Sequence, residues 1–448
     1  MALNEGDIDK SGVEDLVLHS KIPPYVAAFQ ISCEIRQEMN DGSDAFFMLQ
    51  APEDSAEFVD FIENNLRRLA PSKSEDIFTD SNIPLLIKGN AINSQGVCKS
   101  ALELFLDPSI SKLILPVEAP VQESHEYIAD VYTIIYACLT GLTKSFCKQN
   151  IKHTKETNRV LKEFRDTITS PEYMTLGLSD SGNLIRALGE DIRRDFKDFI
   201  EGLDEVLISL ELVEDAKILE VDLPQDLNVL KGVIDDTVVH TIMACNSYNV
   251  SWLTIDNAIS GFVSSYGVDA YPMHILASKL SREEKLEKRL NGLKWHVFAD
   301  LPFPVHNEDF IDLIFDFKAT SLTVLRKILV KHKDSILANS GLMSSLDAMP
   351  IYIVFKLQEK RSAEVVKCAV SLLNEVLRLQ ISIRNGYPAE YNIAMSIRQS
   401  SFKAHKSMFD MKKLIPYYES FIFGHFLNRQ AVVEYFQEKQ NVSYTDAP

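Results

Sequence analysis

The sequence lacks a long apolar run. The longest one, residues 131–142, is interrupted by Thr133, Thr140 and Gly141, whereas a helix needs about 20 apolar residues to cross a bilayer. Residues 1–9 are acidic and polar, unlike the basic start and apolar run of a secretory signal. We therefore expect a soluble, cytoplasmic protein with no membrane partner.

The sequence also lacks clustered cysteines. None of its six cysteines forms a C-x-x-C pair, and its ten histidines are scattered. A structural zinc site needs Cys and His at short, regular spacing, so we expect none. The cysteines stand mostly among apolar residues, which predicts buried free thiols rather than disulfides.

Common catalytic signatures are missing as well. The sequence contains no G-x-x-x-x-G-K-[ST] phosphate loop, no G-x-G-x-x-G, no G-x-S-x-G and no H-E-x-x-H. These absences argue against a P-loop ATPase, a Rossmann dehydrogenase, an α/β-hydrolase and a zinc protease, because the chemistry of each depends on its motif.

The composition is that of a folded protein, and its length predicts two or three domains. A single core rarely grows past about 250–300 residues, and the chain has 448. Net charge is uneven, because residues 281–448 carry 23 basic and 19 acidic side chains while the rest carries 23 and 45. This asymmetry favours different partners for the two parts, although an acidic surface also serves solubility alone.

The pattern of apolar residues divides the chain into three regions and predicts an α/β fold. Residues 1–120 are expected to form a mixed α/β N-terminal region. Residues 121–280 are expected to form a parallel-sheet domain, and residues 281–448 a mostly helical C-terminal domain.

The end of the middle region carries the most informative pattern. A helix is expected to begin near Asp236, and a buried strand over residues 250–255 is followed by Asp256. A short helix ending at Gly267 and a last strand over residues 270–276 come next. In open parallel sheets, ligands bind beyond the carboxyl ends of the strands, so both carboxylates are expected to meet there.

Two converging carboxylates predict a metal site. Carboxylate oxygens suit hard cations such as Mg²⁺ or Mn²⁺. A bound metal of this kind activates water and stabilises charge on a phosphoryl oxygen. The pattern therefore predicts a site able to cleave a phosphodiester.

This stretch resembles the end of a PIN-like ribonuclease domain. The match consists of Asp236 at a helix start, then Leu253-Thr254-Ile255-Asp256 after a buried strand, then Gly267 before a final strand. Upstream, residues 125–130 resemble the family's first strand, and Glu156 or Glu163 stands on the helix that bears its second acid. The resemblance covers about a third of the chain and implies a Mg²⁺- or Mn²⁺-dependent endoribonuclease. The catalytic residues that it implies are carboxylates, namely Asp130, Glu156, Asp236 and Asp256, of which the three aspartates also bind the metal.

A second alignment with the same family takes residues 83–88 as the first strand and residues 112–117 as the second. Glu118 is then the second acid. In that alignment Lys88-Gly89-Asn90 stands where the first Asp should be, which leaves the site incomplete. We favour the alignment on Asp130.

Each site residue also has a structural interpretation. Asp256 is a preferred helix N-cap residue, and Asp235 and Asp236 are first-turn acids that a helix dipole favours. Thr254 either orients the site through its hydroxyl or simply favours a strand. Trp252 is expected in the core rather than stacked on a base.

The C-terminal region carries basic residues with Phe402 and Phe409 interleaved. Basic side chains neutralise phosphates and aromatic rings stack on bases, although a solvated helix face has the same pattern. The nucleic-acid contacts that this pattern predicts are Arg398, Lys403, Lys406, Lys412 and Lys413.

The sequence thus predicts a metal-dependent ribonuclease acting on RNA, with the helical region positioning the RNA or a partner. The alternative is a catalytically inactive PIN-like scaffold, an interaction subunit of a larger complex or a homo-oligomer. The short, charged first strand and the acidic first two thirds favour this alternative. A third hypothesis is that the C-terminal helices bind nucleic acid while the middle region is only a scaffold.

Overall fold

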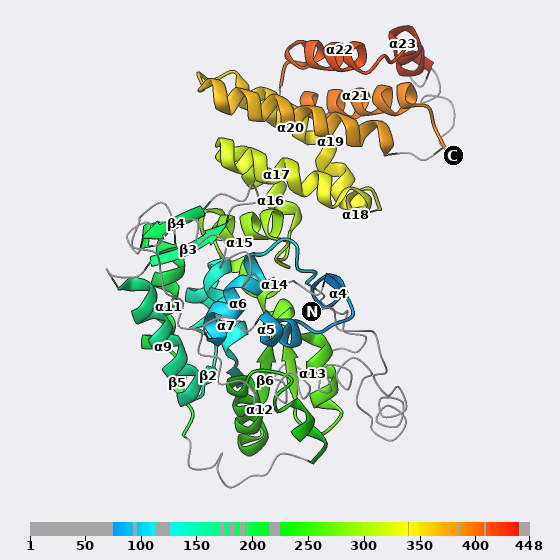
Figure 1. Cartoon of the computed structure of the whole chain (residues 1–448). Coiled ribbons are helices and arrows are strands. Elements are labelled where there is room, and N and C mark those ends of the chain that lie inside the picture. Colours follow the sequence, from blue (N-terminus) through cyan, green and yellow to red (C-terminus); the bar gives the residue numbers. More distant parts are fainter. Residues whose placement is uncertain are drawn as a thin grey trace, which may run out of the picture. The chain divides into compact units, whose positions relative to one another are not determined.

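The computed structural model describes residues 75–92, 96–112, 126–170, 174–178, 184–188, 193–194, 196–214, 225–338, 340–383, 386–406 and 409–438. The chain divides into two compact units, residues 1–284 with 298–304 and residues 285–297 with 305–448 (Figure 1). None of the helices in the described ranges has the length and hydropathy that a membrane span requires.

Five parallel strands form the sheet of the first unit. β1 (Tyr127–Ala129) lies in the centre, between β2 (Ile151–His153) and β6 (Ser251–Thr254). β5 (Glu211–Leu212) and β7 (Ala270–Pro272) are the two edges. Numbered along the chain, the strands lie in the order 3-2-1-4-5. The order reverses between β1 and β6, and open α/β sheets bind their ligands at such a switch point.

The central elements are buried because helices flank the sheet. Every residue of β1 and of β6 is buried, as is typical of parallel strands covered on both faces. Helix α7 (Val131–Thr140) connects the first two strands and is also buried at every position. It is apolar nearly all round, which is the pattern of a helix inside a core. Gly141, with φ of 74°, ends it in the left-handed conformation that glycine favours.

The remaining helices of the first unit pack around this centre. They are α4 (Glu75–Thr79), α5 (Leu85–Ile92), α6 (Val97–Leu106), α8 (Thr143–Phe146), α9 (Lys155–Thr169), α11 (Lys197–Ser209), η2 (Gln225–Leu230), α12 (Asp236–Tyr248), α13 (Asn257–Ser264) and α14 (Met273–Glu283). Along the chain, an antiparallel hairpin of β3 (Met174–Leu178) and β4 (Leu184–Leu188) follows α9 and precedes α11.

Two strand predictions are wrong. Residues 83–88 do not form a strand, because Leu85–Ile92 is helix α5. The last strand ends at Pro272, where α14 begins, since proline lacks the N–H that a ladder needs and its fixed φ suits a helix start. The helix predicted over residues 191–213 ends at Ser209, and Glu211–Leu212 forms β5 instead. The strand predicted over residues 216–221 lies outside the described residues.

The free-thiol prediction is confirmed for the described cysteines, while Cys33 lies outside the described residues. The free thiols are Cys98, Cys138, Cys147, Cys245 and Cys368.

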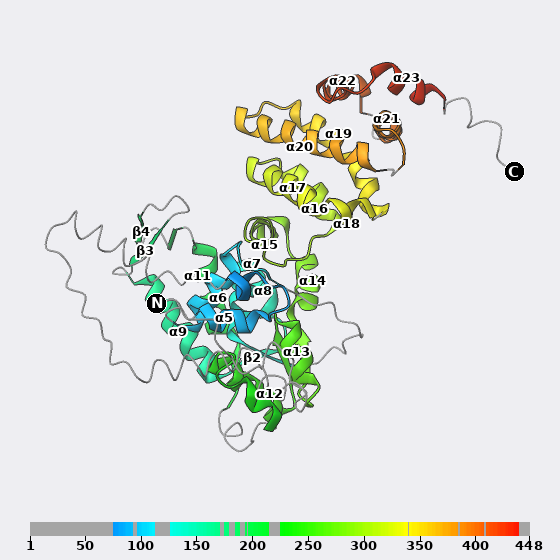
Figure 2. The ribbon, with the colours of Figure 1, turned by 45° about the vertical axis from the view of Figure 1, so that its right-hand side comes forward.

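The second unit is helical, as predicted, and its helices stack in chain order (Figure 2). α16 packs on α19, α17 on α20, and α21 on both α20 and α23. The helices are α15 (Leu286–Phe298), α16 (Asn307–Asp316), α17 (Ala319–Lys331), α18 (Lys333–Ala338), α19 (Ser340–Leu357), α20 (Ala363–Ser382), α21 (Ala389–Lys406), η3 (Met411–Lys413), α22 (Ile415–Gly424) and α23 (Arg429–Glu438).

A buried ion pair joins the first two helices of this unit. The guanidinium of Arg289 pairs with the carboxylate of Asp309, and both side chains are almost fully buried. Asp309 also accepts a hydrogen bond from the backbone N–H of His306 at 2.7 Å. Burial raises the pKa of Asp309 to about 6, although His306 and Arg289 oppose the shift.

We predict that Asp309→Ala destabilises the protein by about 3–5 kcal/mol, because the variant leaves the Arg289 charge buried without its partner. Asp312→Ala is the matched control, since Asp312 is exposed on the same helix, and its effect is expected to stay within about 0.5 kcal/mol. Denaturant unfolding at pH 7 measures both. Equal losses in the two variants would contradict the prediction.

Candidate functional site

Two aspartates stand at the carboxyl ends of the strands that flank the switch point. Asp130 directly follows β1, and Asp256 lies two residues beyond β6. The two strands pair in parallel with Ala129 opposite Leu253, and neighbouring strands lie about 4.8 Å apart. Both aspartates therefore lie where the sequence predicts, at the carboxyl ends of two internal strands of the sheet.

Asp130 is fully buried and makes two structural hydrogen bonds. As the N-cap of α7, its Oδ1 accepts from the backbone N–H of Thr133 at 2.8 Å. Its Oδ2 accepts from the indole Nε1 of Trp252 at 2.9 Å. Burial raises the pKa of Asp130 to about 6, although these bonds and the hydroxyl of Thr254 lower it. The prediction that Trp252 belongs to the core is confirmed.

Asp256 is also buried, and it caps two helices. Its Oδ1 accepts from the backbone N–H groups of Ala258 at 2.9 Å and Ile259 at 3.0 Å, in the first turn of α13. Its Oδ2 accepts from the backbone N–H of Leu86 at 2.9 Å, in the first turn of α5. Burial raises the pKa of Asp256, and the amide hydrogen bonds oppose that shift. Both oxygens of the carboxylate are thus engaged by backbone groups.

Helix α5 lies over the carboxyl ends of these strands (Figure 1). The side-chain amide of Asn90 donates to the backbone carbonyls of Gly232 at 3.3 Å and Val233 at 3.1 Å. Gly89 lies so close to the buried Tyr132 ring that a Cβ at position 89 would be 2.3 Å from the Tyr132 hydroxyl oxygen. α5 therefore occupies space beyond the strands, where such a sheet would bind a ligand.

The two acids at the start of α12, Asp235 and Asp236, have different surroundings. Asp235 is the N-cap, and its Oδ1 accepts from the backbone N–H of Thr237 at 2.9 Å. Burial raises the pKa of the Tyr132 hydroxyl, and the nearby Asp235 carboxylate adds to that shift. Asp236, the acid chosen from the sequence, is exposed. Asp235 is therefore the acid of this pair whose charge acts on the buried Tyr132 hydroxyl.

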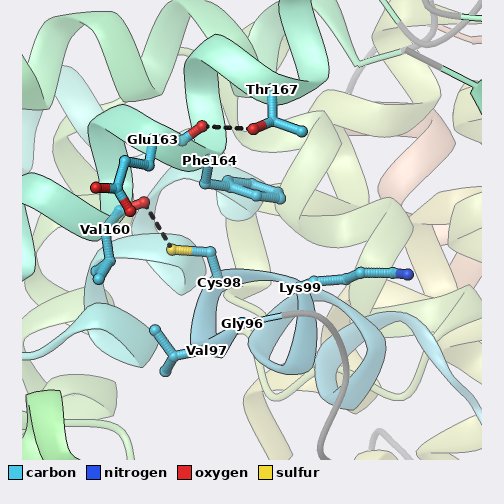
Figure 3. Close-up of a pocket in the computed structure, with 8 residues that line it drawn as sticks. All are labelled: Gly96, Val97, Cys98, Lys99, Val160, Glu163, Phe164 and Thr167. Carbon is cyan, nitrogen blue, oxygen red and sulfur yellow. Dashed lines mark hydrogen bonds between the residues drawn. The ribbon is translucent and has the colours of Figure 1, made fainter. Parts of the chain in front are cut away.

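The candidate glutamates lie on α9. Arg159 donates to Glu156 at 2.5 and 3.1 Å and to Glu163 at 2.7 Å. The bond from Arg159 lowers the pKa of Glu156, which keeps it ionised. Glu163 also lines a cavity of about 240 Å³ between α6 and α9 (Figure 3). The lining of this cavity includes neither Asp130 nor Asp256.

The second alignment loses its first strand, because residues 85–92 are helical. Its second strand and Glu118 lie outside the described residues, apart from Lys112.

Within the described ranges, no group of three or more His, Cys, Asp and Glu side chains is placed to hold one metal ion. The set expected from the sequence, Asp130, Asp236 and Asp256, therefore does not form such a group in this arrangement. A Mg²⁺ ion often takes only one or two carboxylates together with water molecules. The switch-point aspartates could serve that purpose only by giving up hydrogen bonds that they now accept.

Two buried basic residues near the carboxyl ends of the strands were not predicted from the sequence. Lys88 on α5 is fully buried, and its Nζ donates to the backbone carbonyl of Ser111 at 2.5 Å. Burial lowers the pKa of Lys88 to about 8, although Asp80 and Asp256 oppose the shift. His153 ends β2 and is also buried, which lowers its pKa. The sequence signal for Lys88 is only that it directly follows an apolar run.

The basic residues of the helical unit are unequally exposed. Lys412 and Lys413 lie exposed on η3, whereas Arg398 and Lys403 are half-buried on α21. Burial lowers the pKa of Lys403. The side chain of Lys406 lies outside the described residues.

Comparisons with protein-family models, with curated proteins and with solved structures find no match.

We predict that Asp256→Ala destabilises the protein by about 2–4 kcal/mol, since it removes an N-cap and leaves the buried Leu86 amide without an acceptor. Asp236→Ala is the control, because Asp236 is exposed; we expect a change within about 0.5 kcal/mol. Urea unfolding followed by circular dichroism measures both. A loss for Asp256→Ala no larger than the control's would show that the double cap contributes little.

The burial of Asp130 predicts a pH dependence of stability. Its pKa is about 6 in the fold and about 3.9 in an unfolded chain. The folded state then binds more protons between these values, so its stability falls as pH rises from about 4 to about 6, by about 3 kcal/mol. The difference in unfolding free energy between wild type and Asp130→Asn, measured across this range, isolates the effect.

A matched control is Glu156→Gln, since the pKa of Glu156 is lowered rather than raised. Its difference from wild type is expected to change with pH in the opposite direction. A wild-type minus Asp130→Asn difference that stays constant from pH 4 to pH 7 would contradict the prediction.

Proposed function

We propose that this chain is a PIN-like scaffold, an interaction subunit that does not cleave RNA. The carboxyl ends of its strands are closed by protein groups. The observation that carries the proposal is the bonding of Asp130 and Asp256. All four of their carboxylate oxygens accept hydrogen bonds from buried protein groups. In a metal nuclease those oxygens would have to face the cation.

Metal binding at these aspartates would leave buried N–H donors without acceptors. A metal that took Oδ2 of both aspartates would leave the N–H groups of Trp252 and Leu86 unpaired inside the protein. Each such loss costs about 1–3 kcal/mol. Mg²⁺ also sheds its own water reluctantly. The closed arrangement therefore favours a structural role for both carboxylates.

The helical unit supplies a surface suited to a protein partner. Phe423 is 85% exposed and Phe426 is 96% exposed, three residues apart at the end of α22. Phe426 also has φ of 54°, an unusual conformation for a bulky residue and one found often at functional positions. These features support a subunit that acts by binding.

A metal-dependent ribonuclease is the second candidate. The observation that favours it is the position of Asp130 and Asp256 on either side of the switch point. Contacts of RNA with the basic residues of the helical unit stay a prediction under either function.

The deciding experiment is cleavage of labelled single-stranded RNA by the full chain with Mn²⁺, compared with the same reaction in EDTA. We expect no cleavage by the pure protein above the EDTA control. Asp256→Asn is the matched variant, and we expect it to change unfolding rather than the RNA. Cleavage that disappears both in EDTA and in a folded Asp256→Asn variant would overturn the scaffold and establish the nuclease.

A further inference from the structure

One face of α19 carries aromatic and basic side chains together. Tyr352, Phe355 and Lys356 are three and four residues apart, which places them on the same side of this helix. Phe355 is 50% exposed, and Phe315 of the neighbouring α16 is 46% exposed. The ring centres of Phe315 and Tyr352 lie 5.3 Å apart. Exposed apolar side chains that gather in this way often belong to an interaction site.

Two basic side chains lie against aromatic rings at this end of the unit. Nζ of Lys356 is 5.3 Å from the ring centre of Phe315. The guanidinium carbon Cζ of Arg361 is 5.1 Å from the ring centre of Phe317, which is buried. Arg361 also pairs with Glu359. Cation–π contacts hold both cations in place, so a partner that binds them pays less for ordering their side chains.

A basic segment that is distant in the sequence joins this surface. Lys412 and Lys413 lie exposed on η3. Nζ of Lys413 donates to Oε1 of Gln358 at 2.6 Å, across 55 residues. Lys360 lies exposed two residues after Gln358. The basic–aromatic surface, as we define it, consists of Phe315, Phe355, Lys356, Lys360, Arg361 and Lys413.

The charge of this surface is positive. Residues 356–361 and 410–413 carry five basic and two acidic side chains, a balance of 5 − 2 = +3. Both acids already have partners, since Glu359 pairs with Arg361 and Asp410 accepts from the backbone N–H of Lys412 at 3.0 Å. Asp312 lies exposed one turn before Phe315 and limits the positive region on that side. The surface therefore complements an acidic partner.

The contacts of the rings favour a peptide over a nucleic acid. Bases stack on open ring faces, whereas Lys356 lies over the ring of Phe315 and Arg361 lies over the buried ring of Phe317. The net charge of the chain is −18, which repels a long polyanion. A short acidic segment meets mainly the local positive charge, because salt screens charges beyond about 10 Å.

We propose that the basic–aromatic surface binds an acidic peptide segment of a protein partner. Carboxylates of the segment pair with Lys360 and Lys413, and an apolar side chain of the segment packs against Phe355. Arginine and aromatic residues are enriched at protein interfaces, as they are here. The inference rests on the interaction subunit proposed above and names the class of its partner.

The first test selects short random peptides, displayed on phage, for binding to the full chain. The selected peptides are expected to contain more Asp and Glu than Lys and Arg, together with apolar residues. Selected peptides without that acidic excess overturn the proposal. A single-stranded thymidine oligonucleotide is titrated in parallel, and tighter binding of the oligonucleotide than of the selected peptides also overturns it.

The second test places the peptide on this surface, with a fluorescein-labelled selected peptide followed by fluorescence anisotropy. Lys360→Glu is expected to weaken binding at least about tenfold, because repulsion replaces attraction, and Phe355→Ala at least about fivefold. Lys333→Glu is the control for charge, since Lys333 is exposed and lies beyond the far end of α17, about 20 Å along that helix from Phe317.

Phe423→Ala is the control for ring removal, because Phe423 is 85% exposed on α22. Both control variants are expected to bind the peptide like wild type, and circular dichroism checks that all four variants are folded. Equal weakening by Lys360→Glu and Lys333→Glu, or unchanged binding by Lys360→Glu and Phe355→Ala, overturns the proposal.

The two proposals fail in different ways. Metal-dependent cleavage of RNA by the full chain contradicts the inactive scaffold and leaves the peptide measurements unaffected. Selected peptides that are not acidic, or that bind away from Lys360 and Phe355, contradict only the basic–aromatic surface.

Discussion

One carboxylate connects parts of the first unit that are far apart in the sequence. Asp256 caps α13 through two backbone amides and holds the first turn of α5 through a third, across a separation of 170 residues. The first amides of any helix need acceptors from outside the helix, and a buried helix cannot take them from water. Asp256 supplies this acceptor to α5. Together with the hydrogen bonds of Asn90 and the buried apolar side chains of α5, that bond holds the helix over the strand ends.

The N-termini of helices explain how acids at the carboxyl ends of the strands can have a structural role. Three helices, α5, α7 and α13, direct N-terminal amides at Asp130 or Asp256. Each helix N-terminus behaves like about half a positive charge. Together these ends provide part of what a cation would provide, without any metal. Their compensation is incomplete, because burial still raises the pKa of both aspartates.

Particular residues show how far the sequence could predict this site. Asp130 and Asp256 follow short apolar strands and precede helices, so their place at the carboxyl ends was predictable from pattern alone. Helix α5 was not, because an apolar run as short as residues 83–87 fits a buried strand and a buried helix equally well. Its bond to Asp256 uses the backbone of Leu86, and a backbone donor leaves no mark on the residue type. The sequence favours Asp236, which keeps register with the apolar face of α12, whereas the structure makes Asp235 the N-cap of that helix.

The strand order explains why the carboxyl ends of β1 and β6 need a covering element. A reversal between β1 and β6 separates the helices that leave these strands and creates a crevice at their carboxyl ends. A protein without a ligand there must fill the crevice or leave it to water. This chain places α5 there, a helix from outside the strand-and-helix succession that begins at β1. The hydrogen bond from Leu86 of α5 to Asp256, together with the caps of α7 and α13, makes these strand ends a structural joint.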